Sequence, residues 1–163
     1  MASPSPSVSL PARAARLNAT LAQFVDRFQS LFALALRLYV ARVFLLSGLT
    51  KTHDWNTTIA LFENEYHVPV LSPAIAALLG TAAELGLPIL LILGLGTRFA
   101  ALALFAFNIV AVISYPDLSD AGLKDHMLWG ALLLVTFFHG PGKWSLDHFF
   151  GRRFVPIAGI PRV

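Results

Sequence analysis

Four long apolar segments dominate the pattern of hydrophobic and polar positions along the chain. They cover residues 31–50, 73–94, 97–115 and 123–139, and each approaches the roughly 20 apolar residues that a helix needs to cross a bilayer. Helices of a soluble bundle keep a polar face toward water, whereas the second and third segments carry almost none. The pattern therefore predicts an all-α, polytopic membrane protein that is a bundle of four transmembrane helices.

An amphipathic segment precedes the first apolar run. Apolar side chains recur there at steps of three and four residues, with polar residues largely between them, at Leu17, Leu21, Phe24, Phe28 and Leu31. This spacing predicts a helix with one apolar face over residues 17–30. Such a helix either lies on the cytoplasmic interface of the membrane or extends the first transmembrane helix into the cytoplasm.

The two ends of the chain differ from the apolar part in composition. Residues 1–16, which are rich in small, polar and proline residues, are predicted to be a flexible tail, and residues 152–163 a basic C-terminal tail. Residues 31–151 are predicted to form a single membrane domain. Since no apolar run precedes about residue 31, a cleaved signal peptide is not expected.

Composition and charge distribution support a membrane location and set an orientation. Of the 163 residues, 56% are hydrophobic and 13% are charged, against roughly 45–50% and about 25% in soluble domains. Basic residues far outnumber Asp26 and Asp147 in three places: before the first segment, after the fourth, and in the turn between the second and third. They are Arg13, Arg16, Arg27, Arg98, Lys143, Arg152, Arg153 and Arg162. By the positive-inside rule, both termini are predicted to be cytoplasmic.

Three polar residues, Arg42, Glu84 and Asn108, fall near the middle of the predicted spans. Counted at 1.5 Å per residue from one end of their predicted spans, they lie roughly 12–16 Å inside the membrane. Charges at that depth are costly unless they are paired, so Arg42 and Glu84 are predicted to form an ion pair that Asn108 completes. This polar centre either locks two helices together or handles a proton, a quinone headgroup or a polar substrate. Arg37, nearer the cytoplasmic side, is expected to reach the interface.

Histidine and cysteine usage limits the chemistry further. The absence of cysteine excludes thiolate metal sites and iron–sulfur ligation by this chain. No histidine lies at mid-bilayer, so a bis-His haem is not expected. His53, His67 and His126 lie on the acidic outer side and are metal-ligand candidates by residue type alone, because no diagnostic spacing joins them. No nucleic-acid or phosphate-loop motif is present, which leaves the lipid bilayer as the directly predicted partner.

Five short motifs follow one another between residues 36 and 151. They are RVF…SGLTK from Arg42 to Lys51, AELG around Glu84, GLGTR up to Arg98, HMLWG from His126, and GPGKWSLD up to Asp147. Together they resemble the DoxX family of small bacterial membrane proteins. The resemblance implies a four-helix bundle in the bacterial inner membrane, and it marks as family positions Arg42, Lys51, Glu84, Arg98, His126 and Asp147. It carries over no catalytic role for them.

The GPG motif has a structural interpretation of its own. Gly140 and Pro141 are predicted to end the fourth helix and to turn the chain along the cytoplasmic interface. Asp147 would then meet Arg98 or Arg152 on that side.

The resemblance also suggests functions. The family takes its name from a subunit of a thiosulfate:quinone oxidoreductase, and other members are linked to oxidative-stress complexes. The outer loop around residues 62–66 and the Tyr115-Pro116-Asp117 step look like a subgroup that accompanies enzymes modifying small metal-responsive peptides. Partner proteins of either kind, an oxidoreductase or a peptide-modifying enzyme, are therefore expected.

Three functional hypotheses result. The first is an accessory subunit of a redox or stress-response membrane system, acting near quinone or a proton path and not an enzyme on its own. The second is a small transporter or export partner for a metal complex, a modified peptide or a metabolite, for which a homo-oligomer is expected because four helices enclose little space. The third is a membrane scaffold without chemistry.

Overall fold

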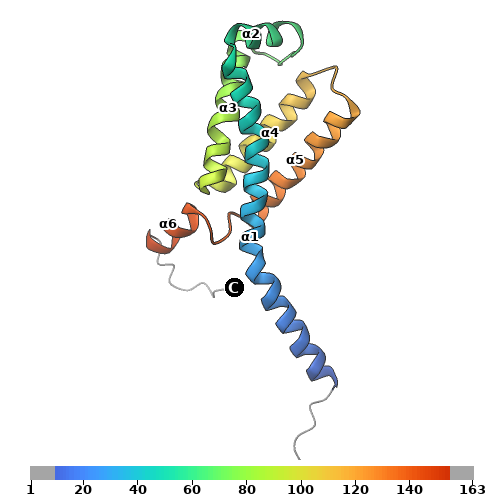
Figure 1. Cartoon of the computed structure of the whole chain (residues 1–163), viewed down its shortest axis with the longest axis vertical. Coiled ribbons are helices and arrows are strands. Elements are labelled where there is room, and N and C mark those ends of the chain that lie inside the picture. Colours follow the sequence, from blue (N-terminus) through green and yellow to red (C-terminus); the bar gives the residue numbers. More distant parts are fainter. Residues whose placement is uncertain (1–9, 155–163) are drawn as a thin grey trace, which may run out of the picture.

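The part of the chain that the structure describes is entirely helical. The computed structural model describes the backbone of residues 10–154 and the side chains of residues 15–26 and 28–151. The helices in this part are α1 (Leu10–His53), α2 (Trp55–Asn64), α3 (Pro73–Leu93), α4 (Thr97–Ser114), α5 (Asp120–His139) and α6 (Leu146–Phe154). Figure 1 shows α1 running the length of the molecule, with α3, α4 and α5 beside its upper half and α2 across the top.

The bundle is held by one apolar core to which α1, α3, α4 and α5 all contribute. Its buried side chains are Val40, Ala41, Phe44, Leu91, Ala100, Ala101, Leu104 and Leu133. Apolar side chains also cover the outside of α3 and α4, as expected for helices that face lipid rather than water. The predicted all-α membrane bundle is confirmed.

Three helices of the described chain, α1, α3 and α4, are long and apolar enough to cross a membrane. Helix α5 has 20 residues, but its first two turns carry Asp120, Lys124 and Asp125. It packs against α4 as the second half of a helical hairpin. A crossing by α5 stays a prediction from the sequence.

Helix α1 is longer than the first predicted span. It has 44 residues, which corresponds to about 66 Å, and neither proline nor glycine interrupts it between Pro11 and Gly48. The amphipathic segment is therefore an extension of the transmembrane helix and does not turn aside along the interface. Residues 10–16, predicted as tail, belong to this helix, whereas residues 1–9 and 155–163 lie outside the described part.

Helix α2 lies where the sequence predicted only a loop. The carboxylate of Asp54 starts it by accepting hydrogen bonds from the backbone N–H groups of Asn56 and Thr57, at 3.0 and 3.2 Å. The hydroxyl of Thr57 donates a further bond to this carboxylate, and these bonds lower the pKa of Asp54. Phe62 anchors the helix against α3, where its ring packs beside Ala76 and Gly80.

We call the end of the bundle that carries the α3–α4 turn and residues 140–148 the basic end, and the end with α2 the acidic end. At the basic end Arg37 is fully buried. Its guanidinium donates hydrogen bonds to the carbonyl oxygens of Leu91, at 3.0 Å, and Trp144. The expectation that Arg37 reaches the interface is wrong, because two carbonyls bind it inside the protein. One is that of Leu91, in the last turn of α3 at the negative end of the helix dipole, and the other is that of Trp144.

Asp147 fastens the α3–α4 turn from the other side. Its carboxylate accepts hydrogen bonds from the backbone N–H groups of Gly96, at 2.7 Å, and Thr97, at 2.8 Å. Its own N–H donates to the carbonyl of Gly94 at 2.8 Å. Asp147 thus caps α4 from a distant segment, because the free N–H groups of a helix start attract a carboxylate. It does not pair with Arg98, one of the two partners expected, and the side chain of Arg152, the other, lies outside the described residues.

Gly94 is required in this turn for two reasons. Its φ angle of 67° is left-handed, a conformation that side chains with a Cβ disfavour. A Cβ at this position would also overlap the guanidinium of Arg37 and the side chain of Ser145. The turn, Arg37 and the segment after α5 therefore fit together only around glycine.

The capping role of Asp147 predicts a loss of stability in Asp147→Ala. Removal of a cap that serves two N–H groups is expected to lower the free energy of unfolding by about 1–2 kcal/mol. Denaturant titration of the purified protein in mild detergent measures this difference. Asp117→Ala, which removes an exposed carboxylate from the α4–α5 loop, is the matched control, and equal losses in the two variants would refute the capping role.

Candidate functional site

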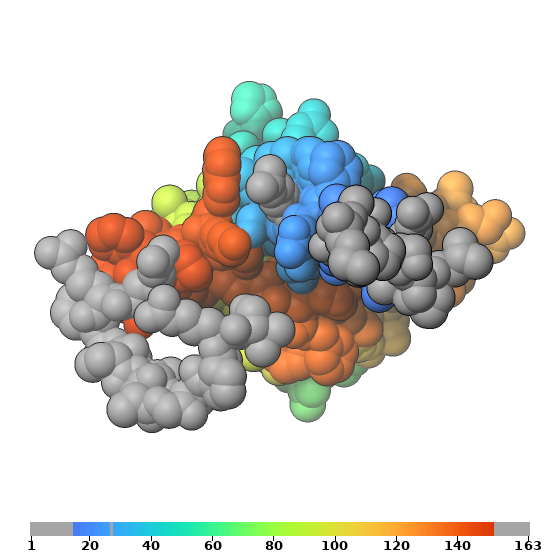
Figure 2. All heavy atoms as spheres, turned by 90° about the horizontal axis from the view of Figure 1, so that it is seen from below, coloured from blue at the N-terminus to red at the C-terminus, as the bar shows by residue number. Residues whose placement is uncertain are grey.

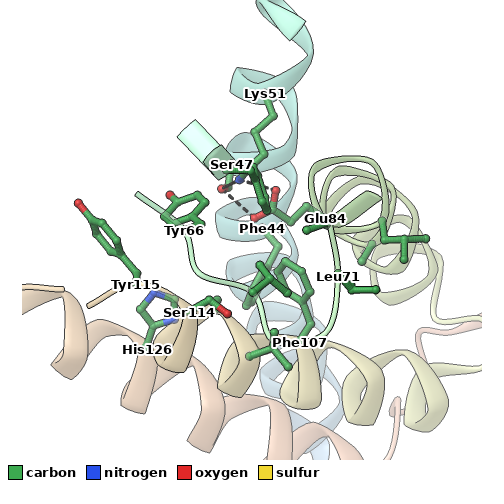
Figure 3. Close-up of a pocket in the computed structure, with 18 of the residues that line it drawn as sticks. Phe44, Ser47, Lys51, Tyr66, Leu71, Glu84, Phe107, Ser114, Tyr115 and His126 are labelled. Atoms are coloured by element: carbon green, nitrogen blue, oxygen red, sulfur yellow. Dashed lines mark hydrogen bonds and ion pairs between the residues drawn. The ribbon is translucent and has the colours of Figure 1, made fainter. Parts of the chain in front are cut away.

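A cavity of about 520 Å³ lies in the bundle toward the acidic end. Helices α1, α3, α4 and α5 form its walls, and α2 with the following loop contributes Phe62, Tyr66, Val68 and Leu71. Most of the wall is apolar and aromatic, with the rings of Phe44, Phe62, Phe107 and Trp129. Figure 3 shows these elements converging on the cavity, with the polar side chains of α1 and α3 on one side and His126 on the other.

The polar group of the cavity is an ion pair between α1 and α3. The Nζ atom of Lys51 lies 2.6 Å from Oε2 of Glu84, and the two side chains are only 12% and 7% exposed. The hydroxyl of Ser47 donates to Oε1 of Glu84 at 3.0 Å, and Lys51 donates to this hydroxyl at 2.9 Å. The three side chains form a closed triangle of contacts (Figure 3), which compensates both charges inside the protein.

The predicted pair of Arg42 with Glu84 is wrong. Arg42 is exposed on the outside of α1, and Glu84 pairs with Lys51 instead. Nine residues separate Arg42 from Lys51, which is about two and a half turns of helix. The two cations therefore point to opposite sides of α1, and only Lys51 can face α3.

Gly48 brings the two helices close enough for this pair. A Cβ at Gly48 would lie 2.9 Å from Cδ2 of Leu85 and 3.0 Å from Cβ of Glu84, closer than such atoms normally approach. Small residues at helix contacts allow the backbones to come near each other in membrane proteins. The short distance lets Ser47 and Lys51, one turn apart on α1, reach the same carboxylate.

Asn108 joins a different partner from the one predicted. Its side-chain nitrogen donates to the backbone oxygen of His126 at 2.9 Å, and its oxygen lies 2.7 Å from Nδ1 of the same histidine. Because the amide oxygen faces the ring, Nδ1 carries the proton, and in the neutral ring Nε2 is left as an acceptor. The ring packs on Trp129 at 4.8 Å between centroids, and His126 and Trp129 both line the cavity.

Tyr66 adds a hydroxyl group to the cavity from the loop after α2. Its ring contacts Phe62 and Tyr115 at centroid distances of 5.0 and 5.2 Å. Burial, and after it the negative charge of Glu84, raises the pKa of Tyr66 above its ordinary value. The phenol therefore stays protonated and can donate a hydrogen bond.

The remaining candidates do not join this site. His53 is exposed at the end of α1, and His67, also exposed, uses its backbone N–H on the carbonyl of Ser114 at 2.7 Å. Among the described residues, no group of three or more His, Asp or Glu side chains could hold a metal ion. Arg98 lies exposed at the start of α4, and it belongs with Asp147 to the basic end.

Sequence reasoning missed Ser47 and Tyr66, and it named Lys51 as a family position without finding its partner. One signal was present: Ser30, Arg37, Phe44 and Lys51 follow one another at seven-residue steps, which places them along one face of a helix. The structure buries the first three and partly buries the fourth. The depth of a residue in the membrane follows from its position along the chain, but the side of α1 that faces α3 does not.

The chain is similar to proteins of one known family. A family model described as DoxX matches residues 32–116, from the start of the membrane part of α1 to the end of α4. The chain belongs to the DoxX family. It is also 36% identical over 121 residues to an uncharacterized protein of Haemophilus influenzae, an alignment that covers 70% of this chain and 80% of that protein. No solved structure matches the chain. The subgroup beside peptide-modifying enzymes stays a prediction.

The ion pair predicts strong coupling between Lys51 and Glu84. Lys51→Met or Glu84→Gln alone leaves one buried group without its partner, and each is expected to lower the free energy of unfolding by about 3 kcal/mol. The double variant should lose clearly less than the sum, because no unpaired charge remains. Unfolding in detergent measures all three variants. Additive losses would contradict the pair, and Lys124→Met with Glu63→Gln, both at exposed positions, is the control.

Proposed function

We propose that this DoxX-family protein is an accessory subunit of a redox or stress-response system in the bacterial inner membrane and that it binds quinone in the cavity at its acidic end. The single observation that carries the proposal is an aromatic cavity of about 520 Å³ with the Lys51–Glu84 ion pair in its wall. Both termini are cytoplasmic in this proposal, so the cavity lies toward the outer side.

The size and walls of the cavity suit a ring-shaped ligand. Binding sites for small molecules have volumes of roughly 300–1,000 Å³ and are mostly apolar, with a few placed polar groups. The rings of Phe44, Phe107 and Trp129 line this one, and aromatic rings stack on one another or meet edge to face. A quinone ring offers the same apolar faces and has polar atoms only at its edge.

The polar groups match the two oxidation states of such a ligand. The two carbonyl oxygens of a quinone accept hydrogen bonds, which Lys51 and the phenol of Tyr66 can donate. The hydroxyl groups of the reduced form donate, and Nε2 of His126 can accept. Reduction adds two electrons and two protons to the ring. The side chains of this cavity bind and exchange protons, while the electrons come from a partner oxidoreductase, and for this reason we assign an accessory role.

The core argues for a binding site rather than a passage. Fully buried residues of α1, α3, α4 and α5 separate the cavity from the basic end, among them Val40, Leu91 and Leu104. The Arg37 and Asp147 contacts then bind the basic end together. A transporter would need a route through both layers. A scaffold without a ligand would fill the space, because protein interiors are normally closely packed.

Quenching of Trp129 fluorescence by a short-tail ubiquinone analogue tests the proposal. The purified protein in detergent is expected to show saturable quenching that Trp129→Phe removes, since this ring lines the cavity. Tyr66→Phe, which preserves the packing, should weaken binding about fivefold through the loss of one hydrogen bond, and Lys51→Met about tenfold or more.

Two results would overturn it. One is quenching that does not saturate, and the other is equal affinity in the wild type, Tyr66→Phe and Lys51→Met. Lys124→Gln, which removes a cation outside the cavity, should bind like the wild type. Thermal unfolding of each variant without ligand separates a loss of binding from a loss of fold.

A further inference from the structure

Two adjoining cavities lie at the basic end, far from the proposed quinone site. The first, which we call the groove, has a volume of about 480 Å³ and runs between α1 and the last turns of α5. The second, which we call the polar pocket, has about 340 Å³ and lies against residues 139–148. They share Gln29, Ala33, His139 and Gly140, so they form one continuous depression. Figure 2, a view of this end, shows α1 in blue beside the orange segment after α5.

The groove has a mostly apolar lining. Phe28, Phe32 and Leu36 line it from α1, and Val135 lines it from α5. Phe28 and Phe32 are 51% and 60% exposed, and a ligand in the groove would cover both rings. The groove follows residues 25–36 of α1, and its part next to the bundle is lined by Phe32, Leu36 and Val135.

One cation, Lys143, lines the polar pocket, and a second, Arg98, lies next to it beside Gly140. The side chains of Lys143 and His148 line the pocket, and within the described residues neither donates a hydrogen bond or forms an ion pair. Arg98 has no such partner there either, and its guanidinium lies beside Gly140, where a Cβ would be 3.4 Å from Nη2. Asp147 also lines the pocket, but its carboxylate accepts hydrogen bonds from the backbone N–H groups of Gly96 and Thr97.

The loop of residues 140–145, which carries Lys143, is held in place. The backbone N–H of Lys143 donates to the hydroxyl of Ser30 at 3.3 Å, and Gly142 packs closely enough that a Cβ would lie 3.2 Å from that of Ala33. Ser145 bonds Gly142 and His148 through its hydroxyl group. The pocket is therefore organised by the fold before any ligand enters.

We propose that this depression binds an anionic phospholipid, with its phosphate headgroup in the polar pocket and an acyl chain in the groove. Phosphate oxygens form strong hydrogen bonds with cationic donors, and basic pockets between membrane helices are suited to anionic headgroups. The apolar groove that continues from the pocket distinguishes a lipid from free phosphate, which would gain nothing from it. The inference is independent of the quinone proposal, because the two sites share no residue.

Native mass spectrometry of delipidated protein in detergent tests this site. Phosphatidylglycerol is the probe, phosphatidylcholine and inorganic phosphate are the comparisons, and only the first is expected to bind tightly. Lys143→Gln should weaken phosphatidylglycerol binding about fivefold, the effect of one cation near a membrane surface. Phe32→Ser, at an exposed position of the groove, should weaken it as well. Lys124→Gln, which removes a cation at the opposite end, should have no effect.

Several outcomes would overturn the proposal. Equal binding of phosphatidylglycerol and phosphatidylcholine would show that the cations play no part. Full competition by inorganic phosphate, or undiminished binding in Phe32→Ser, would reduce the site to a phosphate site. Equal losses in Lys143→Gln and Lys124→Gln would mean a general effect of net charge. Should Lys143→Gln fold poorly, His148→Gln at the same pocket provides the test, judged by the same comparison.

Discussion

Lys51 and Glu84 meet near the middle of the bundle, where neither charge is tolerated alone. Glu84 lies eleven residues from the start of α3, about 16 Å along the helix, and an ionised carboxylate at that depth needs a cation and hydrogen-bond donors. Lys51 and Ser47 supply them. The pair also sets the rotation of α1 against α3, because the contact forms only with Gly48 between the two helices. The walls of the cavity follow from that rotation.

At the basic end, backbone groups rather than opposite charges compensate the charged side chains. Arg37 and Asp147 both bind main-chain groups there. Arg37 donates to the carbonyls of Leu91 and Trp144, and Asp147 accepts from the N–H groups of Gly96 and Thr97. The charges sit at the helix ends whose dipoles favour them. This end is fastened by charged side chains and glycine turns, while the other end keeps an open cavity.

The cations of the described chain thus have two kinds of surroundings, the inside of the bundle and its exposed surface. Arg37 and Lys51 point into the bundle, where Arg37 donates to main-chain carbonyls and Lys51 pairs with Glu84. Arg42 points away from the bundle. Arg98 and Lys143 are exposed at the basic end, where the proposed lipid site lies. Family membership accounts for the shared bundle, but the contacts of each cation depend on the face of the helix from which it projects.

By itself the sequence determined the helices, the membrane environment and the depth of the polar residues. Long apolar runs, glycine turns and the GPG motif are local signals, and the observed ends of α3, α4 and α5 lie within three residues of those predicted. The helix after Asp54 was missed, because its ten residues carry no long apolar run and depend on α3 for packing. The family positions Lys51, Glu84 and Asp147 were also visible in the motifs.

Only the tertiary structure decided which of these residues meet. Arg37, Arg42 and Lys51 lie on one helix, and the sequence prediction chose Arg42 as the partner of Glu84, whereas Lys51 is the observed one. Their depths are readable from the chain, but the choice depends on how α1 is rotated against α3, which close packing at Gly48 determines. Asn108 likewise found His126 on α5 and not the ion pair. Depth is a property of one helix, whereas a contact needs the relative rotation of two, and that arises only when the bundle packs.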